Sequence, residues 1–275
     1  MDARLRVVVD LARRLGLRVE QPVVLRDRSN LLVRLDPAPV VARVAGQTTV
    51  VRHGPAWLAR EIEVARFLGE AGAPVVPPSP LLPAGPHEYL GLVISFWTAV
   101  QEVGEVDPVA AGAALRRCHE LLAGFEGDLP RWGALREVER ILDRLARTEA
   151  LDASRARKVL HLLRDRITAA ALPEQAVHGD AHLGNVLQTA DGPRWNDWED
   201  AFAGPTGWDL ACLLASDRPG SASAAASTAD EVPADALAAL VEARRLQAAA
   251  WSVVLGRARG DDAMAERGLT ALSGP

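Results

Sequence analysis

The chain has 275 residues, of which 49% are hydrophobic and 24% are charged, and its formal net charge is -5. These proportions are typical of a globular protein with a large core, organised as one large or two smaller domains. The sequence offers no basic surface for nucleic acid and no apolar run long enough to span a membrane, so we expect neither partner and a cytoplasmic location.

The first part of the chain predicts a helix followed by a small sheet. Apolar residues recur at helical spacing over residues 2–16, and three short apolar segments are typical of strands: 22–25, 30–35 and 39–44. The connection between the first two strands contains Ser29 and Asn30 but no glycine. It is therefore either a polar turn or a loop that contacts phosphate, and the residues alone leave both readings open.

A helix predicted over residues 57–70 carries one carboxylate within its apolar face. At about 100° per residue, Glu61 falls inside that face and Glu63 falls on the opposite side. The apolar face is formed by Leu58, Ile62, Ala65 and Leu68. Burying an unpaired carboxylate is costly, so Glu61 needs a cationic partner. Arg43, on the preceding predicted strand, is the candidate, and we expect an Arg43–Glu61 ion pair.

The middle of the chain changes from proline-rich to helical. Six prolines between residues 74 and 86 predict an irregular stretch with a short strand at 80–82, and a buried strand follows over 90–94 and runs into Ser95, Phe96 and Trp97. Later segments with helical periodicity are 108–122, 134–147, a helix from Asp152 that ends before Pro173, and 234–260. Residues 216–232, rich in Ser, Ala and Gly, predict a flexible loop.

The segment from His178 to Glu199 holds the residues with the clearest chemistry. Asn185 and Asp197 flank a predicted hairpin, and with the turn centred on Asp191 they would face each other at its open end. A carboxylate and an amide oxygen suit Mg²⁺, which completes its coordination with phosphate and water. Asp180 lies on the loop before the hairpin and is free to meet a substrate hydroxyl. The alternative is a polar surface hairpin without catalytic function.

Asp180 and Asn185 have the spacing of the kinase catalytic loop. The full pattern is His-Gly-Asp-x-His-x-Gly-Asn followed by Asp-Trp-Glu. It resembles the aminoglycoside phosphotransferase and choline kinase-like family of small-molecule kinases. The resemblance implies an α+β, two-lobed protein kinase-like fold. Its small antiparallel-sheet lobe would bind nucleotide over residues 1–97, and its larger helical lobe over 98–275 would hold the catalytic loop and the acceptor site.

The resemblance also implies roles for single residues. Asp180 would be catalytic, and Asn185 and Asp197 would bind the metal. Arg43 stands where a kinase has its phosphate-binding lysine, which is a departure from the pattern because arginine is bulkier. Glu61 would orient it. The backbone of Ser95, Phe96 and Trp97 would bind adenine, and Ser29 and Asn30 would lie near the phosphates. Asp209 would brace the catalytic loop.

The implied activity is ATP- and Mg²⁺-dependent transfer of the γ-phosphate to a hydroxyl of a small molecule. An aminoglycoside-type antibiotic is one candidate acceptor, and a cationic acceptor would suit the mildly acidic chain. Choline-like and homoserine-like metabolites are others. A catalytically inactive, kinase-like nucleotide-binding protein is the alternative, favoured by Arg43 and by the loop that lacks glycine. The sequence leaves open the acceptor, the choice of ATP or GTP, and the oligomeric state.

Overall fold

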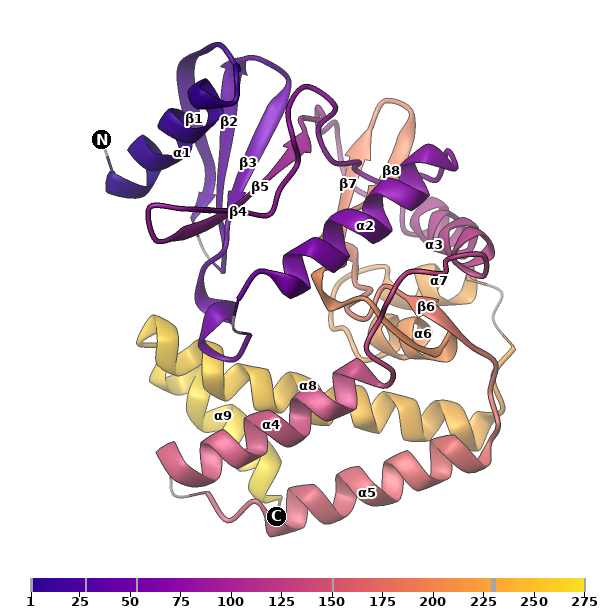
Figure 1. The fold of residues 1–275 in the computed structure, drawn as a ribbon. Helices are drawn as coiled ribbons and strands as arrows, with labels where there is room; N and C mark the ends of the chain where they lie inside the picture. The colour runs from indigo at the N-terminus through magenta and orange to yellow at the C-terminus, as the bar shows by residue number, and fades with distance from the viewer. Residues whose placement is uncertain (1, 28, 53, 150, 229–230, 275) are drawn as a thin grey trace.

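The computed structural model describes residues 2–27, 29–52, 54–149, 151–228 and 231–274. It is an α+β structure in which a five-stranded antiparallel sheet near the N-terminus is followed by a mainly helical region (Figure 1). The sheet has the strand order β1-β2-β3-β5-β4. Its strands are β1 (Val19–Asp27), β2 (Leu31–Pro37), β3 (Val40–Val44), β4 (His87–Tyr89) and β5 (Leu92–Thr98).

The two faces of this sheet have different partners. On β3, Val40, Ala42 and Val44 share an apolar cluster with helix α1 (Ala3–Arg14), whereas Val41 packs against the core of the helical region. Side chains alternate between faces along a strand, so Arg43 lies on the same face as Val41. Helix α2 (Ala56–Glu70), which is reached through the short helix η1 (Gln47–Val50), runs between the sheet and the helical region (Figure 1). This arrangement turns Arg43 toward α2.

The proline-rich stretch differs from the sequence prediction. No strand forms at residues 80–82, and the edge strand beside β5 is β4, which the sequence pattern did not predict. Leu90 and Gly91 both have positive φ, at 46° and 79°, so they form the turn of this hairpin rather than the start of a strand. Strand β5 therefore begins at Leu92.

The helical region is built around one long helix, α8, which packs against α4, α5, α6 and α9. The predicted start of α3 is confirmed, because the Asp107 carboxylate accepts hydrogen bonds from the amides of Val109 and Ala110, at 2.9 and 3.1 Å. The helices of this region are α3 (Pro108–Leu122), α4 (Gly133–Thr148), α5 (Ser154–Ala169), α6 (Gly207–Leu214), α7 (Ser221–Ala226), α8 (Ala234–Arg259) and α9 (Asp262–Ser273).

Two of these helices correct the sequence prediction. Residues 221–226 form helix α7 within the stretch expected to be a flexible loop, although residues 229 and 230 of that stretch lie outside the described residues. Helix α7 packs on α3, and this tertiary contact stabilises a segment whose composition alone predicts a loop. Helix α9 was not predicted. It restarts after Gly260 with Asp261 as its N-cap, whose carboxylate accepts from the Met264 amide at 2.9 Å.

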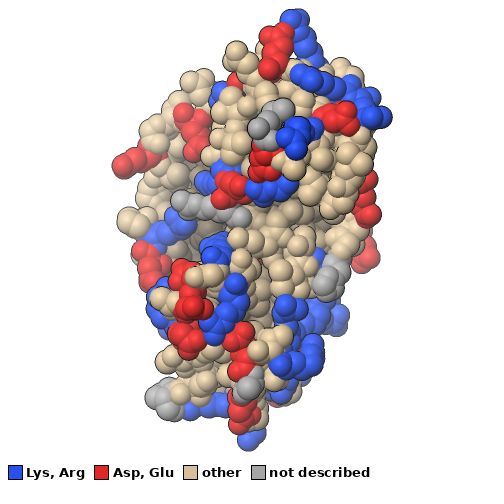
Figure 2. Space-filling model, turned by 90° about the vertical axis from the view of Figure 1, so that its left-hand side faces the viewer, with Lys and Arg blue, Asp and Glu red and all other residues tan. Residues whose placement is uncertain are grey.

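Figure 2 shows basic and acidic side chains interspersed on the face that carries α1, so on this face the described residues form no broad basic patch. Among the described residues, no helix combines the length and apolarity needed to cross a membrane.

Candidate active site

The loop that contains Asp180 is held from beneath by a buried aspartate. Strand β6 (Glu174–Val177) pairs with β9 (Phe202–Pro205) and leads into the loop. The two carboxylate oxygens of Asp209 accept from the amides of His178 and Gly179 at 2.8 and 2.9 Å. The buried His119 completes the contact, with its ring nitrogen 2.8 Å from the Asp209 carboxylate. The structure thus places Asp209 where the sequence resemblance implied a brace.

Gly179 is required at its position in this loop. Its φ is +86°, and a Cβ there would lie 2.1 Å from the Asp200 carbonyl oxygen. Its own carbonyl accepts from the Trp208 indole at 2.9 Å. The loop is therefore fixed by backbone contacts on both sides, which gives Asp180 a defined direction.

Asp180 is partly exposed and lies beside Arg244 and His182. Its side chain is 25% exposed, and its carboxylate accepts from Arg244 of α8 and lies 3.5 Å from the His182 ring. Burial alone raises the pKa of Asp180, but the charge of Arg244 and the hydrogen bond of His182 outweigh it and hold that pKa below its ordinary range. Asp180 is thus an ionised hydrogen-bond acceptor that solvent can reach.

The predicted pairing of Asn185 with Asp197 is wrong by one residue. The hairpin of β7 (Val186–Thr189) and β8 (Gly192–Trp195) pairs Thr189 with Gly192, which leaves a two-residue turn. With this register Asn185 lies opposite Asn196, whose backbone and side-chain N–H groups both donate to the Asn185 carbonyl, at 3.0 and 2.9 Å. Asp197 follows in the left-handed region, with φ 67°.

The side chains of Asn185 and Asp197 offer the kinds of oxygen donor that a magnesium ion takes. The Asn185 side-chain nitrogen donates to the Asp180 carbonyl at 3.0 Å, so the Asn185 amide oxygen points away from that carbonyl. One Asp197 oxygen is buried without a hydrogen bond, although it lies 3.0 Å from Arg43. The described residues contain no cluster of three or more His, Cys, Asp or Glu side chains with metal-site geometry. Two protein oxygens completed by phosphate and water are the arrangement that suits Mg²⁺.

The expected ion pair between Arg43 and Glu61 is present. Glu61 is 1% exposed and hydrogen-bonds Arg43, whereas Glu63 on the same helix is exposed, as the helical periodicity predicted. Glu199 of the short helix η3 (Trp198–Asp200) binds the same guanidinium. Burial raises the pKa of Glu61 to about 7, against the lowering effect of Arg43 and with a further raising contribution from Asp197.

A second buried arginine was missed by the sequence reasoning. Arg52 binds Glu137 through two hydrogen bonds of 2.8 and 2.9 Å, Glu199 at 3.1 Å and Asp200 at 2.5 Å. Glu137 lies at the border of the apolar face of α4, so helical periodicity could have flagged it. Arg52 lies in the turn after η1, where no periodicity exists, and nothing in the sequence marks it.

Arg244, the partner of Asp180, was also missed, and here a signal existed. It follows Leu240 by four residues and Val241 by three on α8, so it lies beside apolar residues on the helix surface. The reasoning that singled out Glu61 would have singled out this arginine as a buried charge in need of a partner. Its partner lies 64 residues away, and no local pattern names it.

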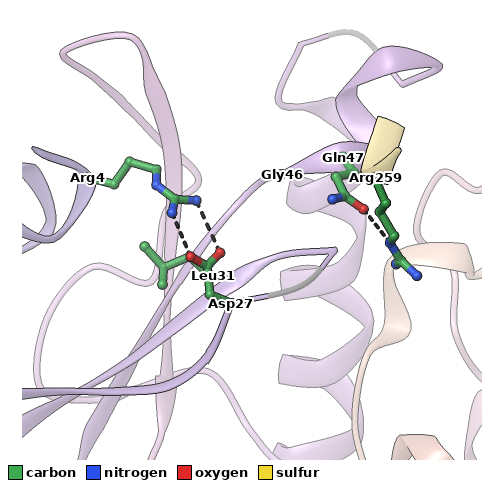
Figure 3. A pocket seen from close by; sticks show the side chains of 6 residues that line it. All are labelled: Arg4, Asp27, Leu31, Gly46, Gln47 and Arg259. Carbon is green, nitrogen blue, oxygen red and sulfur yellow. Dashed lines mark hydrogen bonds and ion pairs between the residues drawn. The ribbon is translucent and has the colours of Figure 1, made fainter. Parts of the chain in front are cut away.

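Ser29 and Asn30 both have protein partners. The Ser29 hydroxyl accepts from Arg259 at 2.7 Å, and the Asn30 side-chain oxygen accepts from the Gly46 amide at 3.1 Å. These contacts favour the polar-turn reading. They border a cavity of about 600 Å³, in which an Arg4–Asp27 pair lies on one side and a Gln47–Arg259 hydrogen bond on the other (Figure 3).

The structure argues against the expected adenine contact at residues 95–97. These residues lie within β5, opposite β3. The Phe96 amide donates to the Ala84 carbonyl at 2.9 Å, and its carbonyl accepts from Ser79 at 3.0 Å. Ser95 and Trp97 pair with Arg43 and Val41. The backbone N–H and C=O groups of residues 95–97 are thus used by hydrogen bonds within and around the sheet. Within the described residues, Val100 and Gln101, which follow β5, make no backbone hydrogen bond.

Comparisons with known proteins bear on the fold and the family. Among the solved structures that match nearly the whole chain are a gentamicin complex of APH(2'')-IIa, amicoumacin kinase hAmiN with AMP-PNP, Ca²⁺ and Ami, and choline kinase LicA from Streptococcus pneumoniae. Their TM-scores are 0.69, 0.72 and 0.68 at 14%, 15% and 13% identity. The matches cover 99% of this chain in each case, and 96%, 93% and 99% of the solved chain with which it is compared.

At these identities the structures establish the protein-kinase-like fold alone. A search of the curated proteins finds no match. A model of the phosphotransferase enzyme family, however, matches residues 24–244, which include most of the sheet, the loop that contains Asp180 and most of the helical region. The chain therefore belongs to the phosphotransferase enzyme family and is a small-molecule kinase.

Proposed function

We propose that the protein transfers the γ-phosphate of ATP to a hydroxyl of a small molecule, with Asp180 as the residue that receives that hydroxyl. The observation that carries the proposal is the state of Asp180. It is ionised, partly exposed and fixed on a loop braced by Asp209, and the Asn185 side chain binds its backbone.

In the proposed reaction the hydroxyl oxygen forms a bond to the γ-phosphorus while the bond to the β–γ bridging oxygen breaks. ADP leaves, and the hydroxyl proton moves toward Asp180. A carboxylate whose pKa is held low is a weak base, so we assign Asp180 the task of orienting the hydroxyl and taking the proton late. Phosphoryl transfer needs placement and charge neutralisation more than strong base catalysis.

The other proposed roles follow from the same contacts. Asn185 and Asp197 would hold Mg²⁺, which supplies charge neutralisation for the phosphates when bound. Arg43, oriented by Glu61, would contact the phosphates. Residues 1–97 would form the nucleotide lobe and 98–275 the lobe with the acceptor site. The adenine edge would contact the backbone of Val100 and Gln101, which makes no backbone hydrogen bond.

The acceptor is a small hydroxylated molecule. The similar structures contain gentamicin and amicoumacin, or belong to a choline kinase, and this range leaves both antibiotics and metabolites as acceptors. An aminoglycoside-type antibiotic therefore stays among the candidates, together with choline-like and homoserine-like alcohols.

Replacing Asp180 tests the proposal. Asp180→Asn keeps the size of the side chain but removes the charge that orients the hydroxyl, so kcat should fall roughly a thousandfold with KM for ATP little changed. The measurement is ADP release with Mg²⁺ and a panel of hydroxylated antibiotics and amino alcohols. Asp191→Asn, at the 84% exposed turn of the neighbouring hairpin, is the matched control and should retain full activity. Turnover at the wild-type rate in Asp180→Asn would refute the role.

A further inference from the structure

Arg244 lies at the position where the proposed function places the acceptor. It projects from α8 and donates to the Asp180 carboxylate, the group proposed to receive the reacting hydroxyl. Its side chain is 15% exposed, and its second hydrogen bond, of 2.6 Å, goes to the Gln247 side chain. A guanidinium has five N–H donors, and these two bonds occupy two of them. Among the described residues, Asp180 is the only carboxylate that pairs with it.

The acidic groups around this loop are already neutralised. Asp200 is held by Arg52 at 2.5 Å, and the fully buried Asp209 is bound to backbone amides and His119. A second arginine adds positive charge at the other end of the loop. Arg218 is exposed and packs directly on Gly184, since a Cβ there would lie 2.6 Å from its guanidinium carbon. Within the described part of the chain no carboxylate pairs with Arg218.

We infer that the acceptor carries an anionic oxygen group, a carboxylate or a phosphate ester, close to its reacting hydroxyl, and that Arg244 binds this group. The inference rests on the proposed function of Asp180. A planar guanidinium binds two oxygens of such an anion at once. The anion would share or take over Arg244, which frees the Asp180 oxygen that Arg244 now occupies for the hydroxyl.

A cationic acceptor would meet Arg244 at close range and be repelled. The net charge of -5 over the whole chain favoured such an acceptor, but it does not describe this site. Around Asp180, Arg244 is balanced only by Asp180 itself, the carboxylate that the acceptor hydroxyl would engage, and no carboxylate of the described residues pairs with Arg218. This geometry favours hydroxy acids over aminoglycosides and choline-like alcohols as acceptors.

Three alcohols of equal skeleton and different charge test the inference: glycerate, glycerol and aminopropanediol. Each is assayed for ADP release with Mg²⁺ and ATP, and its binding is measured by calorimetry with a non-hydrolysable ATP analogue present. The wild type should bind and phosphorylate glycerate at least tenfold better than the neutral alcohol and reject the cationic one, as expected for a charge-assisted contact.

Variants of Arg244 distinguish a role in recognising the acceptor from a role in folding. Arg244→Gln should abolish the preference for glycerate over glycerol, seen as a rise in KM of roughly tenfold or more for glycerate alone. Arg244→Lys should restore part of the preference, because it keeps the charge and loses the second contact. Arg245→Gln, an exposed position on the same helix, is the matched control and should leave the preference intact.

The outcomes are distinguishable from failure of the proposed function. Equal or better binding of aminopropanediol, no binding of glycerate, or an unchanged preference in Arg244→Gln would each overturn the inference. ADP release from the cationic acceptor would do so while leaving the phosphotransferase proposal in place. Binding of glycerate without any ADP release would support the anion site and contradict the proposed transfer.

Discussion

Arg43 shows how a single residue can be crowded by opposite charge. Three carboxylates, those of Glu61, Asp197 and Glu199, surround its guanidinium. One buried guanidinium does not fully balance the charge of three carboxylates. The pKa of Glu61 is accordingly raised to about 7, by burial and by the charge of Asp197. These contacts fix the position of Arg43, the arginine proposed to bind phosphate, without any nucleotide.

This crowding predicts a pH dependence of stability. The pKa of Glu61 is raised from 4.5 to about 7 in the folded protein, so the stabilisation from its protonated form is complete below 4.5 and is lost as the pH rises through about 7. Relative to Glu61→Gln, the wild type should therefore lose roughly 1–3 kcal/mol of unfolding free energy across this window. Urea denaturation of both proteins at a series of pH values measures it.

Glu63→Gln is the control, because it removes a carboxylate from the exposed side of the same helix. Its unfolding free energy relative to the wild type should stay constant over the same range. A difference between wild type and Glu61→Gln that is constant, or that grows in favour of the wild type with rising pH, would contradict the assignment.

At the scale of elements, the contact of α3 with α7 depends on one glycine. A Cβ at Gly112 would lie 2.1 Å from the Ala224 carbonyl oxygen and 2.7 Å from the Ser227 side chain. The backbone of α7 thus rests directly on α3, close to Arg218 and the catalytic loop. This contact converts an Ala- and Ser-rich stretch into a helix.

Gly112→Ala should separate α7 from α3. Alanine is the better helix former, but the clash with backbone should outweigh that gain and destabilise the protein by about 1–3 kcal/mol. Gly124→Ala is the matched control, since the nearest atom to its Cβ would be 3.6 Å away, and it should change stability by less than about 0.5 kcal/mol. Thermal denaturation compares the two. Equal melting temperatures would show that α7 yields without cost.

At the scale of the whole molecule, Arg52 connects the N-terminal part of the chain to the helical region. It follows η1 in the N-terminal part of the chain, and its partners Glu137, Glu199 and Asp200 all belong to the helical region. Its guanidinium also lies over two indole rings, 5.8 Å from the centre of Trp57 and 5.1 Å from that of Trp251. Because Glu199 binds both Arg52 and Arg43, this network couples the packing of the two regions to Arg43, the arginine proposed to bind phosphate.

Arg52→Gln should be strongly destabilising. It would leave buried carboxylates without a cation, and breaking a buried pair in this way costs roughly 3–5 kcal/mol. Arg66→Gln, which removes an exposed arginine from α2, should cost less than about 0.5 kcal/mol. Chemical denaturation of both variants provides the comparison. If Arg52→Gln proved as stable as Arg66→Gln, the network would not hold the regions together.

The sequence by itself determined the features that local pattern encodes. The spacing of Asp180 and Asn185, the N-cap at Asp107 and the phase of Glu61 on its helix all lie within a few turns of chain, where periodicity and capping rules apply. Family membership and fold class follow from the same motifs, and the family match and the structure confirm both. Burial of Glu61 required a cation, and the adjoining strand supplied Arg43.

Only the tertiary structure decided which distant charges meet. Arg52 and Glu137 are 85 residues apart, and Arg244 and Asp180 are 64 apart. Periodicity can show that a charge is buried, but its partner depends on how whole helices pack. The hairpin register was misjudged for a related reason, because a one-residue change in the turn shifts every opposing pair. The pairing of Arg244 with Asp180 therefore follows only from the packing of α8 against the loop that contains Asp180.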